Sequence, residues 1–316
     1  MATEGRDHLL IVEDEAERYR DGVVARCPGL TVEARRPNAP DLVEAIQRAN
    51  LLLAWTFPAE AARAARRLEW IQSMGAGVDH LLAIPGLDER IPVTRVGSGF
   101  GPAMAEYVLG YLLALALDVP LAVEQQQRRV WKPWGAQLLR GRTALVVGLG
   151  TIGGEVARLL RAVGLMVLGV NRSGRPDAAD ETAGVAALDQ LLPRADVLVL
   201  VVPLTAETRR LIDRRRLALL PRGAWVVNVS RGAVVDEAAL TDALESGQVG
   251  AAALDVFETE PLPAESSLWA MRNVLITPHI AGPYAVDHVC EVFAENYRRL
   301  RAGEPLLYLV DRRRGY

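Results

Sequence analysis

The chain has 316 residues, of which 50% are hydrophobic and 24% are charged, and its formal net charge is -3. This length is typical of two domains with buried cores, and the slightly acidic balance argues against a nucleic-acid-binding surface. Neither the two cysteines nor the His, Asp and Glu residues have metal-ligand spacing, so we expect no metal site.

The first hundred residues alternate short apolar runs with polar, helix-like stretches such as 58–67. This alternation is typical of an open parallel sheet with helices on its faces. The polar start of the chain lacks the apolar core of a signal peptide, so we expect a cytoplasmic protein. The predicted strands are 9–12, 31–34, 51–55, 70–73 and 93–95.

A long apolar helix comes next, with Pro102 near its start. Its most apolar stretch, 108–117, is too short to span a bilayer, so we expect no membrane partner. Asp118, Val119 and Pro120 either interrupt this helix or end it.

A second, sharper α/β pattern begins at Arg142. The run 197–202 is almost pure Val and Leu, as expected for a strand that is buried on both faces. Helices are predicted at 155–162 and 236–246. The predicted strands are 143–147, 166–170, 197–202, 225–229, 250–254 and 274–277.

We interpret the final helix, 286–301, as folding back onto the first domain, although spacing alone does not show this. The predicted fold is α/β, with two Rossmann-like doubly wound parallel-sheet domains and a cleft between them. Residues 1–98 plus 286–316 would form a discontinuous substrate-binding domain. Residues 99–285 would form the dinucleotide-binding domain.

The segment after strand 143–147 has the GxGxxG spacing of a phosphate-binding turn and leads into a helix. Gly148 would permit the tight turn, Gly150 would let the backbone approach a pyrophosphate, and Gly153 would let helix and strand pack closely. The helix N-terminus, with Thr151 and Ile152, would offer N–H donors to the phosphates.

The end of the next strand favours NADP(H) over NAD(H). A carboxylate at this place would hold the ribose 2′-hydroxyl of NAD, but Asn171 stands there. Arg172 could pair with a 2′-phosphate, and the Ser173 hydroxyl could donate to it. The alternative, that these are solvated loop residues and NAD(H) binds, stays open.

Three polar segments follow predicted strands and carry one residue each of the types that ketone reduction needs. Arg231 could hold a 2-oxo acid by its carboxylate and carbonyl oxygens. His279 could donate a proton to the developing alkoxide, and Glu260 could orient the imidazole and favour its charged form. Taken singly, each of these residues also has an ordinary structural explanation.

Taken together, the ordered motifs GLGTIGG, NVSRG, DVFETEPLP and TPHIAG resemble the D-isomer-specific 2-hydroxyacid dehydrogenases. The resemblance covers most of the chain from about residue 51. It is nearest to the glyoxylate/hydroxypyruvate reductase branch, because of the turn 171–173 and the stretch 131–133. The resemblance implies that Arg231 binds substrate and that His279 is the acid/base, paired with Glu260.

The same resemblance implies further contacts with substrate and cofactor. The loop of Gly75, Ala76 and Gly77 would hold the substrate carboxylate, and Trp55 would line the pocket. Asp255 would lie near the nicotinamide carboxamide. The full set of expected cofactor-binding residues is Gly148, Gly150, Thr151, Ile152, Gly153, Asn171, Arg172, Ser173, Pro203, Ser230 and Asp255.

The resemblance also implies a homodimer formed through the cofactor domain, to which the segment with Trp131 and Trp134 could contribute. The chain ends near the last helix, which weighs against the regulated 3-phosphoglycerate dehydrogenases. The predicted function is NADPH-dependent reduction of a small 2-oxo acid to the D-2-hydroxy acid. The alternative is a dinucleotide-sensing, corepressor-like binding protein without physiological turnover, because such proteins keep similar motifs.

Overall fold

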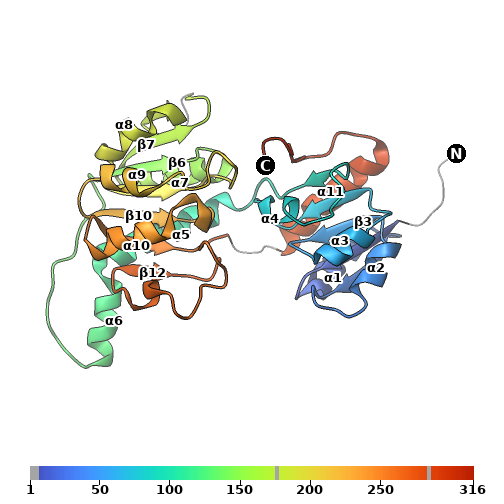
Figure 1. Ribbon diagram of the computed structural model, residues 1–316, viewed down its shortest axis with the longest axis horizontal. Coiled ribbons are helices and arrows are strands. Elements are labelled where there is room, and N and C mark those ends of the chain that lie inside the picture. Colours follow the sequence, from blue (N-terminus) through green and yellow to red (C-terminus); the bar gives the residue numbers. More distant parts are fainter. Residues whose placement is uncertain (1–6, 175–177, 283–285) are drawn as a thin grey trace. The chain divides into compact units, whose positions relative to one another are not determined.

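The computed structural model describes residues 7–174, 178–282 and 286–316. The chain forms two compact units (Figure 1). The first unit comprises Met1–Gly99 together with Tyr284–Tyr316, and the second comprises Phe100–Pro283. The second unit is therefore continuous in sequence, whereas the first is built from both ends of the chain.

A five-stranded sheet, parallel throughout, forms the centre of the first unit. Its strand order is β2-β1-β3-β4-β5, and the crossover connections are helical. The strands are β1 (His8–Val12), β2 (Thr31–Arg35), β3 (Leu51–Ala54), β4 (Trp70–Ser73) and β5 (Val93–Thr94). The helices are α1 (Ala16–Arg26), α2 (Leu42–Arg48), α3 (Ala59–Ala64), α4 (Asp79–Leu82) and α11 (Val286–Ala302).

The period-two alternation along these strands gives each face of the sheet its own helices. Leu10 and Leu52 belong to the core cluster under α2 and α3. Trp70, on the other face, stacks on Phe293 of α11 with ring centroids 5.1 Å apart. Helix α11 also packs against α1, and Figure 1 shows this red helix beside the blue and cyan elements.

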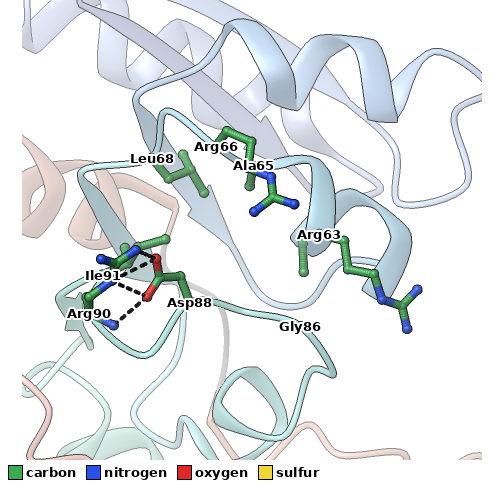
Figure 2. Close-up of a pocket in the computed structure, with 9 residues that line it drawn as sticks. Arg63, Ala65, Arg66, Leu68, Gly86, Asp88, Arg90 and Ile91 are labelled. Atoms are coloured by element: carbon green, nitrogen blue, oxygen red, sulfur yellow. Dashed lines mark hydrogen bonds and ion pairs between the residues drawn. The ribbon is translucent and has the colours of Figure 1, made fainter.

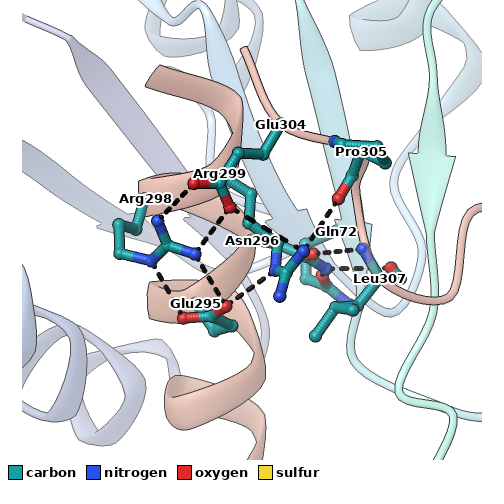
Figure 3. Close-up of polar contacts among 8 residues, drawn as sticks. All are labelled: Gln72, Glu295, Asn296, Arg298, Arg299, Glu304, Pro305 and Leu307. Atoms are coloured by element: carbon teal, nitrogen blue, oxygen red, sulfur yellow. Dashed lines mark hydrogen bonds and ion pairs between the residues drawn. The ribbon is translucent and has the colours of Figure 1, made fainter. Parts of the chain in front are cut away.

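A buried polar network attaches the segment after α11 to strands β4 and β5 (Figure 3). The Asn296 amide donates to Gln72 Oε1 and to the Leu307 carbonyl, both at 3.1 Å, and the Leu307 N–H donates back at 2.8 Å. Thr94 donates to Gln72 Oε1 and accepts from the Trp70 indole. Because these groups are buried, their mutual hydrogen bonds offset the cost of removing them from water.

The second unit has a seven-stranded parallel sheet in the order β12-β11-β10-β9-β6-β7-β8. Its strands are β6 (Thr143–Val147), β7 (Met166–Asn171), β8 (Glu181–Gly184), β9 (Val197–Leu200), β10 (Ala224–Asn228), β11 (Val249–Leu254) and β12 (Val274–Ile276). Its α-helices are α5 (Gly101–Leu117), α6 (Val119–Gln127), α7 (Thr151–Ala162), α8 (Leu188–Leu191), α9 (Arg214–Leu219) and α10 (Glu237–Glu245).

Both faces of this second sheet are covered. Leu145, Leu168 and Leu198 belong to the cluster that includes α8, α9 and α10. Their sequence neighbours on each strand point to the opposite face, where α7 packs on β6 and β7 and α5 packs on α7. The near-continuous apolar strands 143–147 and 197–200 are therefore explained by burial on both sides.

The long apolar helix is interrupted at Asp118 rather than ended there. Asp118 adopts φ 52, closes α5, and accepts a hydrogen bond from the Leu121 N–H to cap α6. Within the described ranges, no single helix is long and apolar enough to cross a membrane. Helices α5 and α6 meet that length and composition only as a pair, and the pair is bent by 59°.

The predicted fold class is confirmed, and the elements differ from expectation in two informative places. Helix α7 begins at Thr151, one turn earlier than predicted, because the glycines of its first turn conceal the helical pattern. Strand β8, 181–184, was not predicted. It is a short edge strand that pairs only with β7, so it lacks the apolar run of its neighbours.

Candidate active site

The glycine turn after β6 leaves no room for side chains at two positions. Gly148 adopts φ +106, and a Cβ there would lie 2.2 Å from the Val201 carbonyl oxygen. A Cβ on Gly153 would lie 1.8 Å from the Gly148 carbonyl oxygen. At Gly150, by contrast, a Cβ would meet nothing within 4 Å. The turn is therefore closed on its protein side and open at Gly150.

Helix α7 starts directly at this opening. Gly150 is its N-cap and has no side chain with which to cap the helix. The first N–H groups of a helix have no intrahelical acceptor and carry the positive end of its dipole. Thr151 is exposed and Ile152 is partly exposed in this first turn. These residues fit the pyrophosphate of a dinucleotide, because the backbone can be approached at Gly150 without a steric obstacle.

Asn171 is the last residue of β7, and Arg172 and Ser173 follow it on the surface. The Ser173 hydroxyl donates to Asn171 Oδ1 at 3.3 Å, so this turn has its own local order. Strand β7 pairs with β6, with Val147 opposite Val170, which places the turn beside the glycine turn. The side chains here fit a 2′-phosphate, because they include a guanidinium, a hydroxyl and an amide in place of a carboxylate.

The turn after β10 is organised by Asn228, a buried residue that we did not single out from the sequence. Its Oδ1 accepts from the Ser230 N–H at 3.1 Å and from the Ser230 hydroxyl at 2.7 Å, and its Nδ2 donates to the Arg231 carbonyl at 3.0 Å. The Arg231 guanidinium donates to the Ser230 carbonyl at 2.8 Å. The sequence signal that could have identified Asn228 is an amide at the end of an apolar strand, because a buried amide needs hydrogen-bond partners.

His279 and Glu260 meet directly, with Nδ1 of the imidazole 2.8 Å from Oε2 of the carboxylate. The other oxygen of Glu260 accepts from the Phe257 N–H at 3.0 Å. Burial by itself would raise the pKa of Glu260. The hydrogen bonds from His279 and Phe257, together with the nearby charges of His279 and Arg231, instead hold its pKa below the ordinary value.

Residues from three separate loops therefore converge in the second unit. A Cβ on Gly232, next to Arg231, would lie 1.8 Å from the Phe257 carbonyl carbon, so the turn after β10 lies against the segment that carries Glu260. A guanidinium, a carboxylate and an imidazole in one place suit the binding and protonation of an oxo acid.

Comparisons with known proteins agree with this geometry. A family model described as "D-isomer specific 2-hydroxyacid dehydrogenase, NAD binding domain" matches residues 109–281. Glyoxylate/hydroxypyruvate reductase A of Salmonella newport is 35% identical over 275 residues, which is 85% of this chain and 88% of that protein. The chain belongs to the D-isomer-specific 2-hydroxyacid dehydrogenase family.

Solved structures of similar proteins include two with a bound nucleotide. A D-isomer-specific 2-hydroxyacid dehydrogenase from Xanthobacter autotrophicus Py2, in complex with NADPH and MES, is 37% identical with a TM-score of 0.86, and the match covers 99% of this chain and 100% of that one. An NADPH-dependent glyoxylate/hydroxypyruvate reductase from Sinorhizobium meliloti, in complex with NADP and sulfate, is 30% identical with a TM-score of 0.89, covering 98% and 100%.

The family also contains longer proteins. D-3-phosphoglycerate dehydrogenase of Methanocaldococcus jannaschii is 35% identical over 293 residues, which is 90% of this chain. The chain spans 54% of the length of that relative. As a member of this family, the chain is an NAD(P)-dependent oxidoreductase.

Two further predicted cofactor contacts of the dehydrogenase lie at strand ends of the same sheet. Asp255, directly after β11, is almost fully buried and accepts hydrogen bonds from Thr277, Ile280 and Ala281. Pro203 follows β9, is exposed, and accepts from the Thr208 hydroxyl through its carbonyl at 2.6 Å. Both positions are at the carboxyl edge of the sheet, where open α/β sheets bind their ligands.

The predicted substrate residues of the dehydrogenase that lie in the first unit form a group of their own. The Trp55 ring covers Gly75 so closely that a Cβ there would lie 2.2 Å from the indole. The same ring stacks on His80, with centroids 3.9 Å apart. Ala76 and Gly77 follow on the partly exposed loop after β4. Trp55 and this loop are thus brought together within the unit.

Figure 2 shows a small pocket in the first unit of the dehydrogenase, with a volume of about 120 Å³. Arg63 and Arg66 are among the residues that line it, and Asp88 forms an ion pair with Arg90 at 2.7 Å. None of the predicted site residues lines this pocket. We assign it no role in the chemistry, because its arginines are exposed and Asp88 is already held in an ion pair.

Proposed function

We propose that this dehydrogenase reduces a small 2-oxo acid of the glyoxylate or hydroxypyruvate type to the D-2-hydroxy acid with NADPH. The observation that carries the proposal is the 2.8 Å contact between His279 Nδ1 and Glu260 Oε2, beside the turn of Arg231. The names of the similar reductases support the substrate class and the cofactor.

In the proposed reaction, His279 protonates the substrate oxygen. Its Nδ1 is turned toward Glu260, so Nε2 is the nitrogen that delivers the proton. The carboxylate of Glu260, whose pKa is held below its ordinary value, accepts a hydrogen bond from Nδ1 and fixes the orientation of the imidazole. When bound, NADPH supplies the hydride that C2 of the substrate accepts, so that hydride and proton together reduce the carbonyl to an alcohol.

Arg231 is proposed to hold the carboxylate and the carbonyl oxygen of the substrate, which fixes C2 and polarises its carbonyl bond. The loop of Gly75, Ala76 and Gly77 in the first unit is proposed to offer backbone N–H groups to a substrate carboxylate. Trp55, which lies over Gly75, is proposed to exclude water and limit the length of the substrate.

The NADPH preference rests on the turn of Asn171, Arg172 and Ser173. The similar structures from Xanthobacter autotrophicus and Sinorhizobium meliloti, which are complexes with NADPH and NADP, support it. In our proposal Gly148, Gly150 and Gly153, with the N–H groups of Thr151 and Ile152, hold the pyrophosphate. Pro203, Ser230 and Asp255 complete the cofactor site, and NAD(H) binds in the same place more weakly.

A substrate panel tests the proposal. Glyoxylate, hydroxypyruvate, phenylpyruvate and 3-phosphohydroxypyruvate should be assayed with NADPH and NADH, and the product resolved on a chiral column. We expect the highest kcat/KM for a small, unphosphorylated 2-oxo acid with NADPH, and a D product. Preference for the phosphorylated substrate or for NADH, or an absence of turnover, would contradict it.

Two variants test the assigned roles. His279→Ala should lose most of its kcat, on the order of a hundred-fold or more, and keep its affinity for NADPH. Arg231→Ala should raise KM and lower kcat, because both binding and polarisation are lost. Wild-type kcat in either variant would remove that residue from the mechanism.

We also propose a cytoplasmic homodimer. The segment after α6 exposes an unusual amount of apolar surface: Trp131 is 97% exposed and Leu138 is 78% exposed. Val130 and Trp134 are exposed beside them, and none of the residues of α6 is buried. Exposed apolar side chains that gather in one segment of the chain are typical of a protein interface, and a second copy of the chain is our proposed partner.

A further inference from the structure

Helix α5 contributes a tyrosine to the cluster that surrounds Asp255. The Tyr107 hydroxyl lies 2.5 Å from Thr277 Oγ1, and Thr277 Oγ1 lies 2.6 Å from Asp255 Oδ1. The three residues come from α5, from the segment after β12 and from the end of β11. Asp255 and Thr277 are buried and Tyr107 is partly buried, so the bond between Thr277 and Asp255 is shielded from water.

The chemistry of the groups fixes the direction of this chain. A carboxylate only accepts hydrogen bonds, so the Thr277 hydroxyl must donate its single proton to Asp255. Tyr107 must then donate to Thr277. Burial raises the pKa of Tyr107, and although the bond to Thr277 opposes this shift, the nearby charge of Asp255 adds to it. The phenol therefore stays protonated and remains a donor throughout the neutral range.

Asp255 in turn holds the loop that carries His279. Its carbonyl accepts from the His279 N–H at 2.9 Å, its Oδ1 from the Ile280 N–H at 2.8 Å, and its Oδ2 from the Ala281 N–H at 2.8 Å. Three consecutive backbone N–H groups are thus bound by one residue. His279 itself adopts φ 56, a conformation that L residues keep only where their surroundings impose it.

We propose that Tyr107 is a positioning residue for the acid: through Thr277 its hydroxyl holds the Asp255 carboxylate, and Asp255 holds residues 279–281 so that the imidazole faces Glu260. This inference rests on the proposed function in one respect, which is that His279 is the acid. Small displacements of a catalytic group reduce turnover steeply. The Tyr107 hydroxyl, which is linked to His279 through Thr277 and Asp255, is therefore expected to affect the rate.

The test compares two tyrosines on one helix. Tyr107→Phe removes the donor and keeps the ring. Tyr111→Phe is the matched control, because Tyr111 stacks on Tyr107 at 4.3 Å and no hydrogen bond of its hydroxyl is found among the described residues. For each variant we would measure kcat, KM, the Kd for NADPH, the isotope effect with deuterated NADPH, and amide hydrogen exchange of 277–282.

We expect Tyr107→Phe to lower kcat roughly ten-fold, to raise the isotope effect, and to speed exchange at 279–281, with an unchanged Kd for NADPH. Tyr111→Phe should behave as wild type. If Tyr107→Phe fails to fold, Thr277→Val and Thr277→Ser replace it: the first loses the hydroxyl and should show the same defects, and the second keeps it and should not.

Identical behaviour of the two tyrosine variants would overturn the proposal. So would faster exchange without a fall in kcat, or a fall in kcat without faster exchange, because the proposal joins the two effects. An absence of wild-type turnover would instead overturn the proposed function, and the exchange comparison would then still decide whether Tyr107 holds the loop.

Discussion

At the scale of single residues, the ionised state of Glu260 has a measurable effect on stability. Its pKa is lower in the folded chain than its ordinary value, so its stabilising contribution is complete above the unfolded pKa and is lost as pH falls through the folded pKa. We expect Glu260→Gln to lower Tm more at about pH 7 than at about pH 3.5. Thermal melts of the wild type and the variant at both pH values give the two differences in Tm. A larger difference at the acidic pH would contradict the prediction.

Arg172 decides the choice of nicotinamide cofactor in our proposal. Charge-assisted hydrogen bonds contribute about 1.5–3 kcal/mol, so Arg172→Ala should reduce kcat/KM with NADPH by roughly ten- to a hundred-fold. NADH lacks the 2′-phosphate and serves as the internal control, with which the variant should match wild type. An equal loss with both cofactors would remove Arg172 from the phosphate site.

Asn171→Asp is the complementary change at the end of β7. The new carboxylate would repel a 2′-phosphate and accept from a ribose 2′-hydroxyl. We therefore expect the ratio of kcat/KM for NADPH over NADH to fall in this variant. A ratio that stays at the wild-type value would show that Asn171 does not face the ribose.

At the scale of elements, two glycines of one turn should respond differently to the same substitution. Gly153→Ala forces the new methyl group into the Gly148 carbonyl, so we expect a loss of about 1–3 kcal/mol in the free energy of unfolding. Gly150→Ala meets nothing within 4 Å and should cost at most about 1 kcal/mol, but its methyl group occupies the opening where the pyrophosphate would approach.

Urea unfolding and NADPH titration of both variants measure this contrast. We expect the apo form of Gly153→Ala to be the less stable of the two variants. Gly150→Ala should lose little stability and nevertheless bind NADPH with a markedly higher Kd than wild type. Wild-type affinity in Gly150→Ala would indicate that the dinucleotide does not approach the backbone there.

Elements with a strong local signal could be predicted from the sequence. Strand 143–147 has the predicted bounds because an apolar run ends sharply at Gly148, and helix 237–245 lies within the predicted 236–246 because Asp236 caps it and Gly247 follows it. Strand 181–184 could not be predicted, since its position depends on pairing with β7 and not on its own residues.

The site was predictable to the extent that its residues lie in motifs. The pairing of His279 with Glu260 is implied by the resemblance of their motifs to those of the family, and the structure places the two side chains 2.8 Å apart. The contact between Tyr107 and Thr277 joins positions 170 residues apart, and neither residue lies in a pattern that links it to the other. Only the folded chain shows such a contact.

At the scale of the whole molecule, the exposed apolar segment after α6 should control the state of association. In the double variant Trp131→Ser and Leu138→Ser, we expect a shift from dimer to monomer in analytical ultracentrifugation, because the apolar area that drives association is removed. Val24→Ser, at an exposed valine of α1, is the control and should not shift. A monomeric wild type would contradict the homodimer itself.

Because the first unit is discontinuous in the sequence, it is the second of the two units to be completed during synthesis. Every strand of the second unit leaves the ribosome before α11, so the second unit can complete its core while the first still lacks a helix. Until then the face of Trp70 lacks its stacking partner, Phe293. The nascent first unit is therefore the part of this protein for which a chaperone would have a surface to bind.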